Sequence, residues 1–186
     1  MRTTNPEKIK AIKQAVINSC KDYGLLDMTT AKIAKAANVS PATIYIHYQD
    51  KKDLLSRLYE EVKAHLQSGM DEVIDDNATI DDQVHAIIEF SIKQYHKFPD
   101  EFNFIRVLWN NHELLDEHAI QFEKRLNGSL QHLFDRIDSS PNYVNVSQTT
   151  LDVFFSVPIL VLNQDTKVNS DEVQQIVNMV INAIKK

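Results

Sequence analysis

The stretch that decides the fold is Thr29–Leu55, TTAKIAKAANVSPATIYIHYQDKKDLL. Thr29 or Thr30 is suited to cap a short helix that runs through Ala37, because threonine oxygens accept the free N–H groups of a first turn. Asn38 follows directly, and asparagine tolerates the left-handed backbone that a tight turn needs. This part therefore predicts a short helix followed by a turn.

A second short helix is predicted directly after the turn. Ser40 supplies its cap, Pro41 suits its first position, and it runs to about Tyr48. Asp50 then caps a longer helix, predicted over residues 51–75. Two short helices joined by a three-residue turn can present the second helix to a DNA major groove, which is about 12 Å wide.

The second short helix has two distinct sides. Ile44 and Tyr48 lie four residues apart and predict one buried face, whereas Thr43, Tyr45 and His47 point away from it. Hydroxyl and imidazole groups are suitable partners for phosphates and base edges. A small helical subdomain with a solvated polar face would show the same pattern, so spacing alone leaves both interpretations open.

Several basic and capping groups surround this helix. Ser40 and the free N–H groups at the helix start can hold a phosphate. Lys51 and Lys52 follow the helix, and Lys32 and Lys35 precede it, so that they can reach flanking phosphates. Together they outline a surface suited to nucleic acid.

Charge is distributed unevenly along the chain. The net charge is −6, but residues 1–60 carry 10 Lys and Arg against 6 Asp and Glu, or +4. Residues 61–186 carry the other 10 basic residues against 20 acidic ones, or −10. A basic head on an acidic body is expected where one end of a protein meets phosphate.

The same stretch resembles the signature of the TetR/AcrR family of transcriptional regulators. The resemblance covers about residues 6–58, and beyond it only the number and order of helices match. It implies a one-component repressor that binds double-stranded DNA as a homodimer. Asn38 stands where the family usually has a turn glycine, and Ala42 replaces another common glycine; its methyl group is suited to contact a thymine methyl.

The resemblance also implies roles for individual residues. Thr30 corresponds to a phosphate contact, Thr43 and Tyr45 to contacts of the recognition helix, and His47 and Lys51 to clamps on the DNA backbone. The predicted DNA-binding set is Thr30, Lys32, Ser40, Pro41, Ala42, Thr43, Tyr45, His47 and Lys51.

The remaining sequence predicts an all-α protein with about nine helices. A first helix is expected over residues 6–23, and the body is expected to hold helices over about 81–97, 100–110, 113–137, 147–162 and 170–185. We expect a three-helix DNA-binding domain over residues 1–50 and a regulatory and dimerisation domain over residues 51–186.

The last two predicted helices carry more apolar surface than one face of a small body usually buries. Packing within a single chain would also explain them, but the family resemblance favours a dimer face. The predicted interface residues are Phe154, Val173, Val177, Val180, Ile181 and Ile184.

Aromatic residues gather in the middle of the body, where the family resemblance implies a pocket for a small-molecule effector. Plain core packing is the alternative. Tyr95, Trp109 and His112 are the predicted pocket residues, because each combines an apolar body with a polar group.

Other functions find little support. A metal-dependent enzyme is the least favoured: His112 and His118 lie six residues apart and no HExxH or CxxC spacing occurs, so that neither a metal nor another cofactor is expected. The single cysteine, the absence of a signal peptide and the short apolar runs predict a cytoplasmic protein without a membrane span. A regulator controlled by a protein partner, or by no ligand, remains an alternative.

Overall fold

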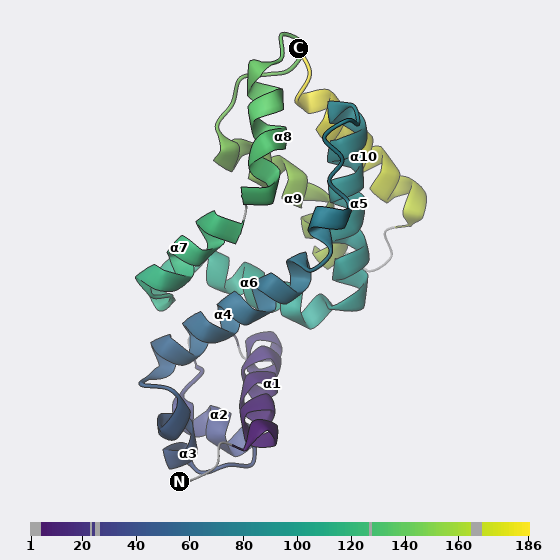
Figure 1. Ribbon diagram of the computed structural model, residues 1–186. Coiled ribbons are helices and arrows are strands. Elements are labelled where there is room, and N and C mark those ends of the chain that lie inside the picture. Colours follow the sequence, from purple (N-terminus) through teal and green to yellow (C-terminus); the bar gives the residue numbers. More distant parts are fainter. Residues whose placement is uncertain (1–4, 23, 25–26, 127, 165–168) are drawn as a thin grey trace. The chain divides into compact units, whose positions relative to one another are not determined.

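A computed structural model describes residues 5–22, 24, 27–126, 128–164 and 169–186. Over these residues the chain forms ten α-helices and two short 3-10 helices, and no strand (Figure 1). The α-helices are α1 (Pro6–Asp22), α2 (Thr30–Ala36), α3 (Pro41–His47), α4 (Lys51–Gln67), α5 (Ile80–Lys97), α6 (Pro99–Trp109), α7 (Glu117–Leu126), α8 (Gly128–Ser139), α9 (Gln148–Gln164) and α10 (Ser170–Ala183).

The predicted all-helical fold with a helix-turn-helix near its N-terminus is confirmed. Tyr23, where the first helix is predicted to end, lies outside the described residues. The described part has one α-helix more than the nine expected: α7 and α8 lie where a single helix is predicted over residues 113–137, and residue 127 between them lies outside the described residues.

The predicted start at residue 113 is too early, and the cause is local. Residues His112–Leu114 form a 3-10 helix, and Leu115 is extended at φ −101° and ψ 148°. Asp116 then caps α7, its Oδ1 accepting the N–H of Ala119 at 2.8 Å. Gly128 begins α8, in keeping with the low helix propensity of glycine.

The prediction for α4 is also too long. The helix ends at Gln67 and not near residue 75. Gly69 lies in the left-handed region at φ 90°, where a residue without Cβ is favoured, and a 3-10 helix follows over Met70–Glu72. The buried stripe of the sequence continues past the true end of the helix, so periodicity alone overshoots it.

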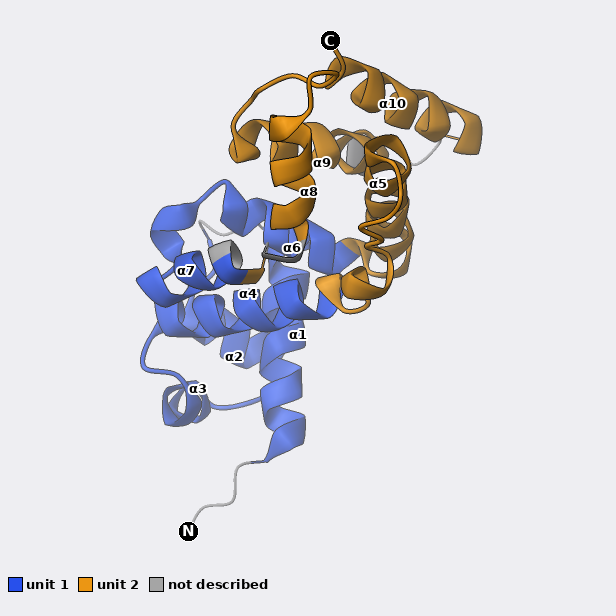
Figure 2. Ribbon diagram, turned by 45° about the horizontal axis from the view of Figure 1, so that its top comes forward, with its two compact units in different colours: residues 1–66, 100–125 blue, residues 67–99, 126–186 orange. Residues whose placement is uncertain are grey.

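The chain divides into two compact units, coloured blue and orange in Figure 2. Unit 1 contains residues 1–66 and 100–125, and unit 2 contains residues 67–99 and 126–186. These limits reflect packing, whereas the predicted boundary at residue 50 separates functions and stays a prediction.

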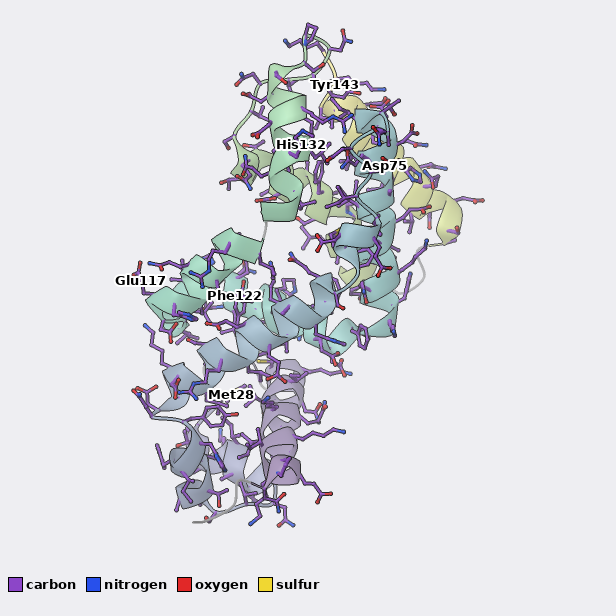
Figure 3. The ribbon with its side chains drawn as sticks, in the orientation of Figure 1. Met28, Asp75, Glu117, Phe122, His132 and Tyr143 are labelled. Carbon is purple, nitrogen blue, oxygen red and sulfur yellow. The ribbon has the colours of Figure 1, made fainter. Side chains whose placement is uncertain are left out.

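Unit 1 encloses a core to which both parts of its chain contribute. Ile12, Ile33 and Ile44 of the first three helices are fully buried, as is Phe104 of α6. Met28, labelled in Figure 3, is buried just before α2. The helix-turn-helix therefore rests on apolar side chains that hold α3 from one side only.

Unit 2 is built mainly on α5, α8, α9 and α10, whose buried side chains form one hydrophobic cluster. Three polar side chains of unit 2, those of Tyr143, Asp81 and Lys185, contact one another; Tyr143 is labelled in Figure 3. The Tyr143 hydroxyl donates to Asp81 Oδ1 at 2.6 Å, and Lys185 Nζ lies 2.5 Å from Asp81 Oδ2. Burial, and then the adjacent Asp81 carboxylate, raise the pKa of Tyr143 to about 12.

Candidate nucleic-acid interface

The turn between α2 and α3 depends on Asn38. Its φ is 53°, the one positive φ among described residues other than glycine. The N–H of Asn38 donates to Lys35 O at 3.2 Å, and that of Val39 to Ala34 O at 2.9 Å. Asparagine thus takes the conformation expected from the sequence, and the chain turns from α2 into α3 between Ala36 and Pro41.

Both short helices begin with side-chain caps. Thr29 Oγ1 accepts the N–H of Lys32 at 3.2 Å, which assigns the cap of α2 to Thr29 and leaves Thr30 as its first residue. Ser40 Oγ accepts the N–H of Thr43 at 3.2 Å and lies 2.9 Å from Thr43 Oγ1. These bonds fix the start of the recognition helix α3.

The recognition helix is anchored on one face. Ile44 is fully buried and Tyr48 nearly so, as predicted from their spacing. Tyr45 is 55% exposed and Ile46 is 57% exposed, whereas Thr43 and His47 are half-buried. The helix therefore directs a mixed polar and apolar surface away from its core.

Two hydroxyls of the predicted DNA-binding set lie side by side. Thr30 Oγ1 on α2 and Tyr45 Oη on α3 share a hydrogen bond of 3.0 Å. The two oxygens come from consecutive helices, 15 residues apart in sequence. A phosphate oxygen could accept from either hydroxyl without a large movement of the backbone.

The other predicted DNA-binding residues lie around this pair. Lys32, Ser40, Pro41 and Ala42 are exposed, and Lys51 is half-buried at the start of α4. The Lys52 ammonium instead donates to the backbone oxygen of Glu113 at 3.1 Å, so that this cation supports unit 1 as well as adding positive charge. The structure describes positions here, and the DNA contacts themselves stay a prediction.

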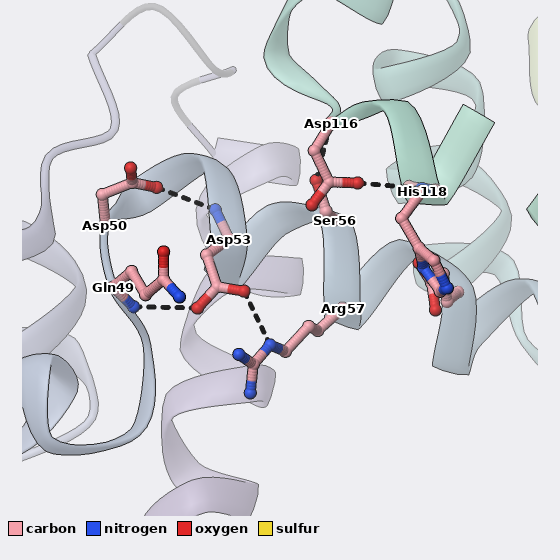
Figure 4. A network of polar contacts seen from close by, with 9 residues as sticks. Gln49, Asp50, Asp53, Ser56, Arg57, Asp116 and His118 are labelled. Atoms are coloured by element: carbon pink, nitrogen blue, oxygen red, sulfur yellow. Dashed lines mark hydrogen bonds and ion pairs between the residues drawn. The ribbon is translucent and has the colours of Figure 1, made fainter. Parts of the chain in front are cut away.

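A polar network holds the beginning of α4 (Figure 4). Asp50 Oδ1 accepts the N–H of Asp53, and Asp53 Oδ2 accepts that of Gln49, both at 2.8 Å. Arg57 Nε donates to Asp53 Oδ1 at 2.6 Å, and its guanidinium lies 5.8 Å from the Tyr48 ring centroid. These contacts connect the end of the recognition helix to the first turns of α4.

The same helix is tied to Asp116 and to the first turn of α7, which belong to the same unit (Figure 4). The buried Ser56 Oγ accepts the N–H of Asp116 at 2.9 Å, and His118 Nδ1 lies 2.6 Å from Glu60 Oε1. Sequence reasoning missed this connection because its partners lie about sixty residues apart and only the fold brings them together.

Sequence reasoning also missed Ile46. Apolar residues in a short helix are usually counted as core, and this one is exposed on the side away from Ile44. Its position was available from helical spacing, because two residues correspond to about 200° of rotation.

The three predicted pocket residues occupy both units. Trp109 is 41% exposed, its ring centroid lies 4.8 Å from that of His112, and Lys63 Nζ lies 5.7 Å from the Trp109 centroid. Tyr95 belongs to unit 2, where its hydroxyl donates to Leu162 O at 3.4 Å. Binding of an effector by these residues stays a prediction.

The predicted dimer residues lie in or against the core of unit 2, and their contact with a second copy stays a prediction. Val177, Val180, Ile181 and Ile184 are buried in the core of unit 2. Because these side chains are already packed inside their own chain, they present little surface in this conformation. Phe154 and Val173 are only partly buried and pack against that same core.

Two further findings bear on the other predictions. Among the residues that the structure describes, no group of three or more His, Cys, Asp or Glu side chains is placed to hold a metal ion. Within the same ranges, no helix is long and apolar enough to cross a membrane.

Comparison with known proteins places the helix-turn-helix in a family. Residues 17–58 match the model of the bacterial regulatory proteins of the tetR family. The chain is 27% identical over 118 residues to the nucleoid occlusion factor SlmA of Vibrio cholerae, an alignment that covers 63% of this chain and 55% of SlmA. The chain spans about half to two thirds of the length of the curated relatives that it matches.

Solved structures extend the likeness to the whole fold. A TetR family regulator from Marinobacter aquaeolei aligns over 100% of both chains with a TM-score of 0.79 and 21% identity. The TetR-like regulator LfrR from Mycobacterium smegmatis, solved in complex with proflavine, aligns over 96% of this chain and 97% of its own, with a TM-score of 0.66 and 14% identity. Residues 17–58 thus carry the helix-turn-helix of the bacterial regulatory proteins of the tetR family, and the chain as a whole has the fold of TetR family transcription regulators.

Proposed function

We propose that this regulator is a repressor that binds a palindromic operator as a homodimer and is released by a small molecule bound in its C-terminal body. The observation that carries the DNA-binding part is the Thr30–Tyr45 hydroxyl pair beside the exposed face of α3. One hydroxyl of the pair donates to the other, which can donate its own proton to a phosphate oxygen, while the anchored helix can enter the groove.

Electrostatics support the same orientation. Residues 1–60 carry a net charge of +4, so that the end with the helix-turn-helix attracts the DNA backbone, and the remaining −10 does not. Lys32 and Lys51 lie on either side of α3 in the sequence and would meet flanking phosphates. Such contacts set position and affinity, whereas base contacts set the sequence that is read.

The dimer face is assigned to the outward sides of α9 and α10. Val153 and Leu160 of α9 and Met179 of α10 are large apolar side chains exposed to solvent. The seventeen residues of α9 include one charged side chain, Asp152, and the charged residues of α10 are confined to its first turn. Scarce charge with exposed apolar residues is typical of an interface core.

A two-fold axis through such a face would place one recognition helix on each half of the operator. Symmetry then requires two equal half-sites, one helical turn or a multiple of it apart. This is the reason for proposing a palindrome.

Control by a small molecule is supported by the likeness to LfrR, which was solved with proflavine. An effector releases DNA only if it binds the released conformation more tightly than the DNA-bound one. Tyr95 remains our candidate for contact in unit 2, and Trp109 and His112 our candidates in unit 1. The repressor role itself rests on family resemblance.

A second candidate is a regulator whose body answers to a protein partner, or to no ligand. The similarity to SlmA favours it, because the name nucleoid occlusion factor refers to the nucleoid and not to a small molecule. The two candidates share the same DNA-binding end and differ in what the body recognises.

Selection from a library of random duplexes tests the operator proposal. We expect a palindrome bound by two chains, with Tyr45→Ala at least tenfold weaker, since a hydrogen bond to a charged group contributes about 1.5–3 kcal/mol. Tyr45→Phe is the matched control, which keeps the ring and removes the hydroxyl. Asymmetric sites bound by one chain would overturn the dimeric reading, and wild-type affinity in Tyr45→Ala would overturn the assigned contact.

A thermal-shift screen with aromatic compounds distinguishes the two candidates. A small-molecule effector must both stabilise the protein and lower its operator affinity. By linkage, DNA must lower the affinity for the effector by the same factor. Compounds that stabilise the protein without changing operator affinity would not support release. A protein partner that alone changes operator affinity would favour the second candidate.

A further inference from the structure

Ile46 occupies the outermost position on the recognition helix. It lies two residues beyond the buried Ile44, which at about 100° per residue places it about 200° around the axis, nearly opposite the core. Its side chain is 57% exposed. Within unit 1 it therefore projects away from the apolar face that holds α3.

An apolar strip runs along this outermost line. Ala42 precedes Ile46 by four residues, or about 40° around the axis, and is also exposed. Thr43 and Tyr45 lie on opposite sides of the strip. The helix thus presents a methyl group and an isoleucine along its centre, with a hydroxyl on each flank.

The two kinds of surface suit different parts of DNA. When a helix lies in the major groove, its outermost line faces base edges and its flanks face the two backbones. The flanking hydroxyls can bond phosphates. The central strip has no hydrogen-bonding group, so base nitrogens and oxygens beneath it would lose water without gaining a partner.

One major-groove feature matches an apolar strip. Thymine presents its C5-methyl group there, and no other base does. We propose that Ile46, with Ala42, reads thymine methyl groups and so sets which base pairs the operator carries at the centre of each half-site. This inference rests on the proposed operator binding and adds a specificity-determining residue to it.

The experiment replaces thymine with deoxyuridine, one position at a time, in the operator obtained from the random library. Uracil keeps every hydrogen-bonding group of thymine and lacks only the methyl. We expect about a fourfold loss of wild-type affinity for each methyl removed beneath the strip, and about the same loss per half-site, or about sixteenfold for the dimer, for Ile46→Ala on thymine DNA. Ile46→Ala should then be indifferent to uracil at that position.

Two controls keep the test specific. Ile46→Ala should melt at the wild-type temperature because its side chain is exposed, and it should keep the wild-type salt dependence because it contacts no phosphate. Ile46→Val should retain part of the discrimination. Additive losses for the variant and the uracil substitution, or no loss at any thymine, would overturn the inference while leaving operator binding intact. A library that yields no operator would overturn the proposed function together with it.

Discussion

Met179 and Val177 lie two residues apart on α10 and should respond to truncation in opposite ways. Met179 is 69% exposed and belongs to the face that we assign to the dimer, whereas Val177 is 1% exposed and belongs to the core of unit 2. Met179→Ala should therefore weaken dimerisation without unfolding the chain. Val177→Ala should destabilise the fold and leave the dimer face chemically unchanged.

The expected magnitudes follow from burial. Full burial of a methionine side chain contributes about 1.5–3 kcal/mol. Because Met179 is still 69% exposed in the single chain, roughly two thirds of that free energy can be gained on dimerisation. A two-fold interface buries the residue in both copies, so that truncation to alanine, which retains one methyl, should cost about 2–3 kcal/mol. That corresponds to about a 30- to 150-fold rise in the dimer Kd.

Val177→Ala removes two buried methyl-sized groups. Their transfer and the cavity left behind should lower the free energy of unfolding by about 2–3 kcal/mol. For a chain of this length the Tm should fall by roughly 5–10 °C.

Sedimentation velocity over a wide concentration range gives the dimer Kd, and a thermal melt gives the Tm. Met179→Leu is the matched control, because it keeps the apolar volume and should stay dimeric. An unchanged Kd in Met179→Ala, or a wild-type chain that stays monomeric at micromolar concentration, would refute the assigned face. A weaker dimer in Val177→Ala at an unchanged Tm would show that Val177 contacts the partner copy after all.

Three further predictions concern other parts of the chain. Lys51→Ala should weaken binding to all duplexes and reduce the slope of log affinity against log salt concentration by about one unit per chain. Titrations at several salt concentrations measure this slope. Lys93→Ala, which replaces an exposed lysine of unit 2, is the control and should keep the wild-type slope. Tyr143 has a folded pKa of about 12, above the unfolded value of about 10, so its stabilising contribution is complete below pH 10 and lost as the pH rises toward 12. Thermal melts across that pH range should therefore show a steeper fall of Tm for the wild type than for Tyr143→Phe. Parallel curves would contradict a stabilising hydrogen bond between Tyr143 and Asp81. Burial raises the pKa of the Cys20 thiol to about 12, so a thiol reagent at pH 8 should react only as fast as the protein unfolds, and rapid labelling of the native protein would contradict the packing of α1.

The helix-turn-helix could be predicted in detail because its determinants are local. Asn38 fixes the turn, Ser40 caps the recognition helix and Ile44 anchors it, and each effect acts within four residues. At that range the identity of a residue and its spacing nearly determine its direction. The predicted outward positions of Tyr45 and Thr43 needed no knowledge of the rest of the fold, although contact with DNA stays a prediction.

The helix limits within residues 113–137 have only weak local signals, and the burial of α10 depends on more distant partners. The apolar period continues through residues 113–137, so that the sequence indicates one helix, and only the Asp116 cap and Gly128 signal the interruption. On α10 the valines and isoleucines form a regular stripe, but a stripe does not say whether it meets its own chain or a second copy. In this chain α5 and α9 pack against that stripe from within unit 2.

The missed helix boundaries and the open question of what covers α10 have one physical origin. Hydrophobic periodicity reports that a surface must be buried and says nothing of what buries it. The exposed apolar residues therefore carry the information that the pattern lacks. Met179 on α10 and Ile46 on α3 are apolar side chains that their own chain leaves exposed to solvent. If a second copy of the chain covers Met179 and a thymine methyl covers Ile46, both exposed side chains are explained by the two partners that a dimeric operator-binding protein requires.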